Sequence, residues 1–176
     1  MAEAAETIVR EVETMKRMVD EFARFARMPL PQPQEVDLPR LIEEAVALYR
    51  GVKPGVEVSA AVAPAAQRAR FDPEQIRRAL LNLLDNAVEA TTAPGAVTVT
   101  ASADRGALRL RVADSGPGIP PELRSKLFLP YFSTKGRGSG LGLAIVDRIV
   151  SDHQGSIEVA DNAPRGTAFT IELPQG

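Results

Sequence analysis

Residues 72–91 read DPEQIRRALLNLLDNAVEAT, a run in which apolar side chains recur every three or four positions. This period is typical of an amphipathic helix, and an Asp-Pro pair starts helices well because Asp caps free amides and Pro fits the first turn. One face is apolar: Ile76, Leu80, Leu83, Leu84 and Ala87. The opposite face carries Asn82, Asn86 and Glu89. Asn is a mediocre helix former, so this polar face is either a solvated surface or a binding surface.

The segments around this helix alternate between helical and extended patterns. Helices are predicted at 38–49, 122–127 and 141–151, and strands at 56–63, 67–71, 96–103, 107–113, 156–160 and 167–173. The strands at 96–103 and 107–113 flank a tight turn, Asp104-Arg105-Gly106, and therefore form a hairpin. Hairpin strands among interleaved helices indicate a mixed sheet with helices on one face. The sequence thus predicts an α+β two-layer sandwich for residues 37–176.

The N-terminal part is organised differently. Residues 2–28 are predicted to form one helix with a heptad seam made of Ile8, Val12, Met15, Val19, Phe22 and Ala26. Either this helix packs on its own domain, or it is a coiled-coil or bundle segment that mediates dimerisation. Three prolines, Pro29, Pro31 and Pro33, end the helix. We therefore place a Pro-rich linker at 30–36, between residues 1–29 and the domain at 37–176.

Composition limits the classes of function. The 176 residues carry a net charge of −2, so we expect no nucleic-acid partner. The absence of cysteine excludes disulfides and thiolate zinc sites and is compatible with the cytoplasm. The apolar runs are far shorter than the ~20 residues of a membrane span, and we expect no signal peptide.

Two features of the domain are candidates for ligand chemistry. The amide oxygens of Asn82 and Asn86 suit phosphate surroundings or a hard cation such as Mg²⁺, which prefers oxygen ligands. Asp114 ends a predicted strand and opens the loop DSGPGIP (114–120), where Gly116 and Gly118 let a ligand approach closely. A carboxylate there is able to accept a hydrogen bond from an exocyclic amine such as that of adenine. A plain tight loop is the alternative.

The run GRGSGLGL (136–143) leads directly into a predicted helix. Free amides at a helix N-terminus together with glycines form an anion site, the usual place for phosphates. The spacing is neither that of a Walker loop nor that of a Rossmann fingerprint, so a flexible linker stays open as an alternative. Lys135 and Arg137 either meet phosphate charge or are solvated surface cations.

In their order and spacing, these stretches resemble the catalytic, ATP-binding domain of sensor histidine kinases, in particular the nitrogen-regulation type. NLLDNA (82–87) resembles the family's N box, DSGPG (114–118) its first glycine box, LFLPYFSTK (127–135) its F box and GSGLGL (138–143) its second glycine box. HQGSI (153–157) and GTAF (166–169) match two closing signatures, and residues 19–29 resemble the end of the second dimerisation helix. The resemblance implies a Bergerat-type ATP-binding fold.

The resemblance also implies roles for individual residues. Asn86 would ligate Mg²⁺, with Asn82 and Lys135 beside it as catalytic residues near the phosphates. Asp114 would bond the adenine amino group, and Thr167 would join through water. The other nucleotide contacts implied are Gly116, Gly118, Ile119, Phe128, Phe132, Lys135, Gly138, Ser139, Gly140, Leu141 and Gly142, with the two Phe anchoring a lid. Glu89 and Ala90 depart from the family pattern, so contacts from them stay open.

The function implied is that of a protein-histidine kinase fragment using ATP and Mg²⁺. It would donate the γ-phosphoryl group to a histidine on a dimerisation helix absent from this chain, and the phosphate would then pass to an Asp of a response regulator receiver domain. A homodimer through the N-terminal helix and a cytoplasmic position in a membrane-bound sensor kinase are also implied.

His153 is the single histidine of the chain. The family's phosphoacceptor lies in a His-Glu motif on the first dimerisation helix, whereas His153 follows a predicted helix and precedes a Gly and a strand. We therefore expect a structural role for His153. Two other functions compete: a regulatory nucleotide-binding or dimerisation module without turnover, and a Bergerat-type ATP hydrolase. Such hydrolases use a Glu where this chain has Asn82, which cannot act as a general base. Asp85 and Glu89 could in principle accept the proton instead.

Overall fold

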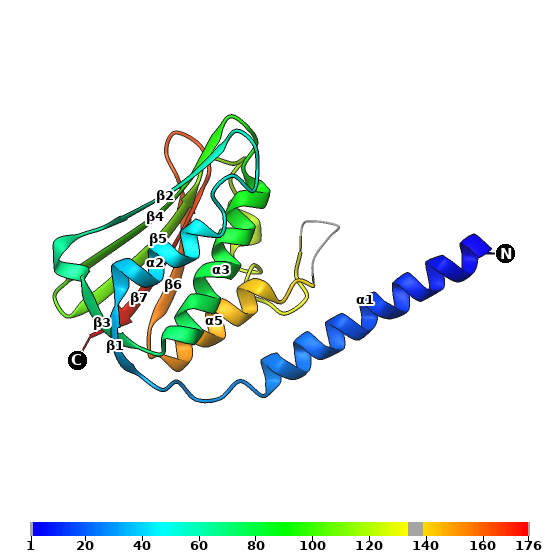
Figure 1. Cartoon of the computed structure of the whole chain (residues 1–176), viewed down its shortest axis with the longest axis horizontal. Helices are drawn as coiled ribbons and strands as arrows, with labels where there is room; N and C mark the ends of the chain where they lie inside the picture. Colours follow the sequence, from blue (N-terminus) through cyan, green and yellow to red (C-terminus); the bar gives the residue numbers. More distant parts are fainter. Residues whose placement is uncertain (1, 134–138, 176) are drawn as a thin grey trace.

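The computed structural model describes residues 2–133 and 139–175 of the chain. The main strands are β2 (Val56–Val62), β4 (Gly95–Asp104), β5 (Ala107–Asp114), β6 (Ser156–Asp161) and β7 (Thr167–Pro174). They form one sheet in the order β2-β4-β5-β7-β6, in which β2 and β4 run parallel and the other neighbours antiparallel. Helices α2 (Leu38–Ala47), α3 (Pro73–Ala90) and α5 (Gly142–Asp152) cover one face of this sheet (Figure 1). The predicted α+β two-layer sandwich is confirmed.

The β4–β5 hairpin sets the register at the centre of the sheet. Asp104 pairs with Ala107, so the connection contains two residues, Arg105 and Gly106, with φ of 50° and 77°. Positive φ at both positions is typical of the tight turns that match the twist of a hairpin. Alternate residues of the two strands are buried against the helices: Val97, Val99, Ala101, Leu108, Leu110 and Val112.

Helix α3 is the central helix of the helical layer. The Asp72 carboxylate accepts hydrogen bonds from two backbone amides of the first turn. The last turn of α3 has no basic residue, but Lys53 donates from a neighbouring loop to two of its final carbonyls. The predicted apolar face is buried: Ile76, Leu80, Leu83, Leu84 and Ala87. Burial of this face fixes the rotation of α3 and therefore the direction of its asparagine face.

A strand lies in the region that the sequence pattern assigned to a linker. Strand β1 (Gln34–Asp37) pairs antiparallel with β3 (Arg68–Phe71), and the two form a small sheet apart from the main one. The run QEVD contains one apolar residue, so its local pattern gives no strand signal. Pairing with a distant segment decides its conformation.

Helix boundaries otherwise differ from the prediction by a few residues. The short helix α4 (Pro121–Arg124) ends before the predicted residue 127, and turns follow it. A 3-10 turn, Pro64–Ala66, lies between β2 and β3. The other helices differ from the prediction by one or two residues, which is usual at helix ends because the last turns are held by fewer hydrogen bonds.

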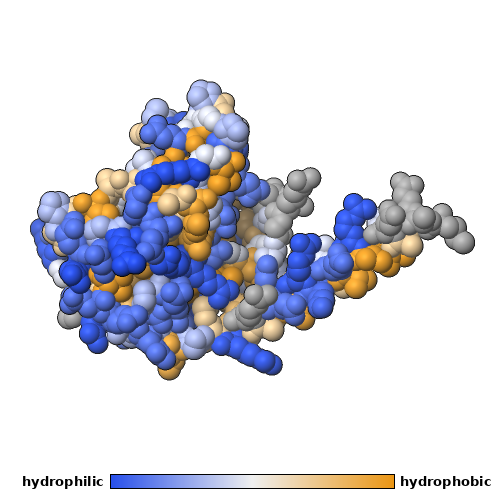
Figure 2. Space-filling view, in the orientation of Figure 1, coloured by the Kyte–Doolittle hydropathy of each residue, from blue (hydrophilic) through white to orange (hydrophobic). Residues whose placement is uncertain are grey.

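Helix α1 (Ala2–Ala26) extends away from the sandwich (Figure 1). Five residues of its seam are between 44% and 66% exposed: Ile8, Val12, Met15, Val19 and Phe22. Figure 2 shows an apolar stripe along this helix. At its C-terminal end the Phe22 ring stacks on Tyr131 with centroids 6.1 Å apart, and Phe25 packs against the core. The described part of the chain therefore leaves most of the seam uncovered. None of its helices has the length and apolar character needed to cross a membrane.

His153 joins the end of α5 to the start of α3. Its Nδ1 lies 2.8 Å from the carbonyl oxygen of Ile149, and its Nε2 accepts from the backbone amide of Asp72 at 3.1 Å. Both contacts together require a neutral ring with its proton on Nδ1. Because both ring nitrogens are used within the fold, the structure agrees with the structural role expected for His153.

Candidate functional site

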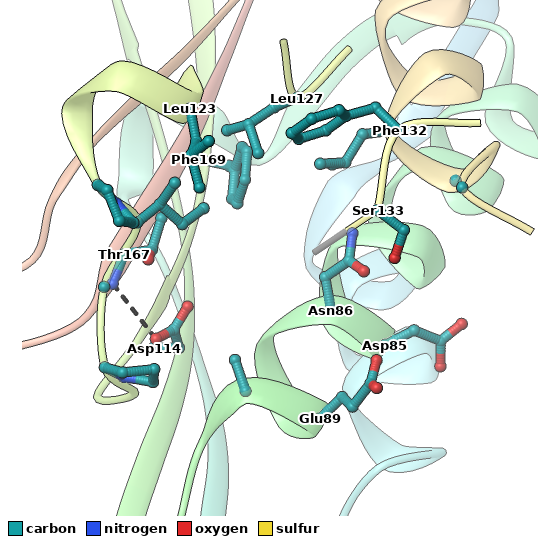
Figure 3. A pocket seen from close by; sticks show the side chains of 18 of the residues that line it. Asp85, Asn86, Glu89, Asp114, Leu123, Leu127, Phe132, Ser133, Thr167 and Phe169 are labelled. Carbon is teal, nitrogen blue, oxygen red and sulfur yellow. Dashed lines mark hydrogen bonds between the residues drawn. The ribbon is translucent and has the colours of Figure 1, made fainter. Parts of the chain in front are cut away.

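A cavity of about 650 Å³ lies between α3 and the end of β5 with the glycine loop that follows it. This volume is within the range of small-molecule sites. Figure 3 shows its two walls: Asp85, Asn86 and Glu89 of α3 on one side, and Asp114 with Thr167 on the other. Leu123, Leu127, Phe132 and Phe169 form an apolar end, at the top of the view. The cavity thus combines a broad apolar surface with a few polar groups.

Asp114 is the buried carboxylate of the site, with 4% of the residue exposed. Its Oδ1 accepts hydrogen bonds from the backbone amides of Gly116 at 2.8 Å and Thr167 at 3.2 Å. Figure 3 shows the other carboxylate oxygen directed into the cavity. The two amides stabilise the ionised side chain and fix its orientation. This arrangement presents a charged acceptor to an amine of a flat ligand that enters the cavity.

The α3 wall carries amide and carboxylate side chains. Asn86 lines the cavity one turn before Glu89 and Ala90, which line it as well. The departures from the family pattern at these last two positions therefore lie at the site. Asp85 also accepts a hydrogen bond from the hydroxyl of Tyr49, which lies 2.7 Å from its Oδ1. Burial and the neighbouring carboxylate raise the pKa of Tyr49, so its hydroxyl stays a donor to Asp85.

The N-terminus of α5 forms the other polar end of the cavity. Gly140, Gly142 and Leu143 line the cavity there, and within residues 2–133 and 139–175 no side chain of the N-cap residue bonds the helix start. The amides of a first helical turn and the positive end of the helix dipole favour an anion at this position. Asn82 does not line the cavity among the described residues: its Nδ2 donates to the carbonyl of Arg78 at 3.1 Å. A Cβ built on Gly142 would lie 3.3 Å from the Oδ1 of Asn82, so this amide faces the start of α5.

The segment between α4 and α5 packs closely on itself at one glycine. The amide of Tyr131 donates to the carbonyl of Gly140 at 3.0 Å, and Gly140 has a φ of +69°. A Cβ on Gly140 would lie 2.7 Å from the backbone of Tyr131, so a side chain there is excluded. Of the two Phe expected to anchor this segment, Phe132 lines the cavity. Phe128 packs edge-on against Phe169 instead, with centroids 6.4 Å apart.

The structure brings most of the sequence-predicted site residues together. The lining includes Asn86, Asp114, Gly118, Ile119, Phe132, Ser139, Gly140, Gly142 and Thr167. Among the described residues the lining omits Asn82, Gly116, Phe128 and Leu141, the last of which is buried in the core. Lys135 and Gly138 lie outside the described residues. For all of these, contact with a nucleotide stays a prediction.

Several lining residues were not singled out by sequence reasoning: Pro117, Pro120, Leu123, Leu127, Ser133, Leu143 and Phe169. Most are apolar or lie in loops. An apolar residue that lines a cavity has the same spacing as one in the core, so periodicity cannot distinguish them. Their position depends on how the segment 120–133 folds over the sheet.

Residues 71–176 match the family described as histidine kinase-, DNA gyrase B-, and HSP90-like ATPase. The nitrogen regulation protein NtrY of Azorhizobium caulinodans is 40% identical over 97% of this chain. The sensor histidine kinase ZraS of Escherichia coli (strain K12) is 34% identical, also over 97%. The chain spans 23% of the length of NtrY and 37% of that of ZraS.

Solved structures give the same assignment. The nucleotide-free catalytic domain of histidine kinase ThkA has a TM-score of 0.75 and 34% identity, over 82% of this chain and 96% of its own. Full-length ShkA in complex with AMPPNP has a TM-score of 0.83 and 34% identity, over 97% of this chain and 38% of its own. ThkA in complex with the response regulator protein TrrA has a TM-score of 0.79 and 29% identity, over 97% and 50%. The chain therefore belongs to the family of histidine kinase-, DNA gyrase B- and HSP90-like ATPases, as a catalytic, ATP-binding domain of the sensor histidine kinase type.

Proposed function

We propose that this chain is the phosphoryl-donor part of a two-component sensor histidine kinase. It binds Mg²⁺-ATP in the cavity and donates the γ-phosphoryl group to a histidine, other than His153, on a dimerisation helix. From there the phosphoryl group passes to an Asp of a response regulator receiver domain. The observation that carries the proposal is the buried carboxylate of Asp114 facing the amide of Asn86 across one cavity of nucleotide size.

The residues around the cavity fit a magnesium nucleotide. Asp114 suits the amine of adenine, and the N-terminus of α5, which has no side-chain cap from its N-cap residue among the described residues, suits phosphate. The amide oxygen of Asn86 suits Mg²⁺, which usually takes one or two protein ligands and completes its shell with phosphates and water. Within residues 2–133 and 139–175 no cluster of three or more His, Cys, Asp or Glu could hold the ion without nucleotide. Bound Mg²⁺ would neutralise phosphate charge, and the chain would hold ion and nucleotide as one unit.

ATP hydrolysis is the competing reaction. Attack by water needs a general base, a role that the amide Asn82 cannot take. The carboxylates Asp85 and Glu89 line the cavity, but Asp85 already accepts a hydrogen bond from the hydroxyl of Tyr49. Transfer to an imidazole requires chiefly positioning and charge neutralisation. Amide side chains and a helix N-terminus supply both. We therefore favour phosphoryl transfer over hydrolysis.

The N-terminal part completes the proposal. Residues 1–29 would be the second helix of a dimerisation module, joined through 30–36 to the catalytic domain at 37–176. The exposed seam of α1 supports this role, because an apolar stripe of this length is stabilised by packing on a partner helix. We propose a homodimer through this seam, and a cytoplasmic position within a membrane-bound sensor kinase.

Replacing Asn86 by Ala should remove most of the Mg²⁺ dependence of nucleotide binding. We expect the wild-type chain to bind a non-hydrolysable ATP analogue about tenfold or more tightly with Mg²⁺ than with a chelator. The variant should lose this difference, because it lacks the amide oxygen that would coordinate the ion. Calorimetric titrations in both buffers measure it. Glu74→Ala, an exposed change at the start of the same helix, is the matched control. Equal Mg²⁺ dependence in Asn86→Ala and wild type would rule out the metal role.

Phosphoryl transfer is tested with labelled ATP. The chain alone should not accumulate phosphohistidine, because both nitrogens of His153 are hydrogen-bonded within the fold. Mixed with a separate fragment that carries the family's first dimerisation helix, it should label that fragment slowly, since no linkage raises the effective concentration. The control is His153→Ala. Self-labelling of the wild type that disappears in this variant would place the acceptor inside the domain and overturn the proposal.

A further inference from the structure

We propose that Asn162 is a positioning residue for adenine recognition, acting through the backbone of Asp114; the inference rests on the ATP site proposed above. Asn162 lies in the connection between β6 and β7, behind the wall that carries Asp114. Its Nδ2 donates to the carbonyl oxygen of Asp114 at 2.9 Å, and its Oδ1 accepts from Nη2 of Arg111 at 2.9 Å. The Asn162 side chain thus joins the end of β5 to the β6–β7 connection. The guanidinium of Arg111, on the face of the sheet away from the helices, orients this side chain.

The position of Asp114 explains why this donor is needed. Pairing between β5 and β7 ends at Ala113 with Ala168, so the carbonyl of Asp114 lies one residue beyond that ladder. Two backbone amides fix the Asp114 side chain, and the Asn162 amide donates to its main-chain carbonyl. Loss of a hydrogen bond to a buried carbonyl is costly and favours a shifted backbone. Beyond the end of the β5–β7 ladder, Asn162 therefore holds the Asp114 carbonyl from behind.

Two arginines extend the same restraint along the glycine loop. The Nε of Arg165 donates to the carbonyl of Gly116 at 3.0 Å. The Nη2 of Arg124 donates to the carbonyl of Ile119 at 3.0 Å and also pairs with Asp161 at the end of β6. We name Asn162, Arg165 and Arg124 the carbonyl clamp. Because it holds three carbonyls of the loop that shapes the adenine end of the cavity, the clamp pre-forms this end before a ligand enters.

The test compares two nucleotides that differ at the position of the adenine amine. ADP and inosine diphosphate share the ribose and phosphates, but inosine lacks the exocyclic amine from which Asp114 would accept a hydrogen bond. The affinity for ADP divided by the affinity for inosine diphosphate therefore reports the position of Asp114. In Asn162→Ala we expect this ratio to fall about three- to tenfold, the range of one weakened hydrogen bond, with little change in the affinity for inosine diphosphate. Calorimetry with the full chain and Mg²⁺ measures both affinities.

Matched variants complete the design. Arg111→Met, which removes the partner of Asn162, should lower the ratio in the same direction by a smaller factor. Arg109→Met changes the same residue type two positions earlier on the same strand, where Arg109 pairs with Glu172, and should leave the ratio unchanged. Arg165→Ala, an exposed clamp residue, should lower the ratio even if Asn162→Ala does not fold.

Each outcome decides the inference. An unchanged ratio in folded Asn162→Ala overturns it, as does equal weakening of both nucleotides, which would mean a general loss of stability. An unchanged ratio in Arg165→Ala overturns it when Asn162→Ala does not fold. Failure of the wild-type chain to bind either nucleotide would instead refute the proposed ATP site. The two failures are therefore distinguishable.

Discussion

Asp114→Asn is expected to weaken ATP binding about ten- to hundredfold, the loss that corresponds to one hydrogen bond with a charged group, about 1.5–3 kcal/mol. The Oδ1 of Asp114 is held by the amides of Gly116 and Thr167, while the other oxygen points into the cavity (Figure 3). An Asn side chain can keep the inner contacts with its oxygen, which turns its NH₂ toward the ligand. That NH₂ would then meet the amine of adenine, donor against donor. Calorimetric titration with Mg²⁺-ATP measures the loss.

The same variant should prefer a different base. Inosine triphosphate carries a carbonyl oxygen where adenine has its amine, so the NH₂ that Asp114→Asn introduces finds an acceptor. We expect the preference for ATP over inosine triphosphate to shrink strongly or reverse in Asp114→Asn. Asp104→Asn, at the exposed hairpin turn, is the matched control and should bind both nucleotides like the wild type. Unchanged ATP affinity in Asp114→Asn would refute the adenine assignment.

Gly166→Ala is expected to lower the free energy of unfolding by about 2–5 kcal/mol, combining backbone strain with overpacking. Gly166 has a φ of +121°, which L-residues rarely adopt, and a Cβ there would overlap the carbonyl oxygen of Asp114. This is the carbonyl that Asn162 holds, so relief of the overlap must displace Asp114. The variant should therefore lose ATP affinity as well as stability. Urea unfolding and nucleotide titration measure the two effects.

Gly51→Ala separates backbone strain from overlap. Gly51 also has positive φ, +75°, but a Cβ there would meet nothing within 4 Å. It should destabilise the chain by about 1 kcal/mol through the left-handed backbone alone and leave ATP binding unchanged. If Gly166→Ala costs no more than Gly51→Ala and binds ATP normally, the close contact between residue 166 and Asp114 has no energetic role.

The elements that the sequence predicted well are those with strong local signals. Helix α3 has a capping Asp, a Pro in its first turn and an apolar period, and it forms nearly as expected, Pro73–Ala90. The β4–β5 hairpin has alternating residues around a turn that contains Gly106, and its register follows from that turn. Strand β1 was missed because its four residues carry one apolar side chain and become a strand by pairing with β3. Local sequence patterns predict elements that are stabilised by interactions within one segment. They do not predict a strand that forms only by pairing with a distant segment.

The sequence by itself determined the α+β class, the asparagine face of α3, the Asp114 loop and the glycines before α5, because each depends on side-chain type and spacing within one segment. Only the tertiary structure decided how these segments meet. It brought Asn86 and Asp114 to opposite walls of one cavity and turned Asn82 toward the start of α5. It also placed Asn162 behind Asp114 although they are 48 positions apart in the chain. The physical reason is that a hydrogen bond between distant segments depends on the packing of the whole sheet and helix layer, which no single segment encodes.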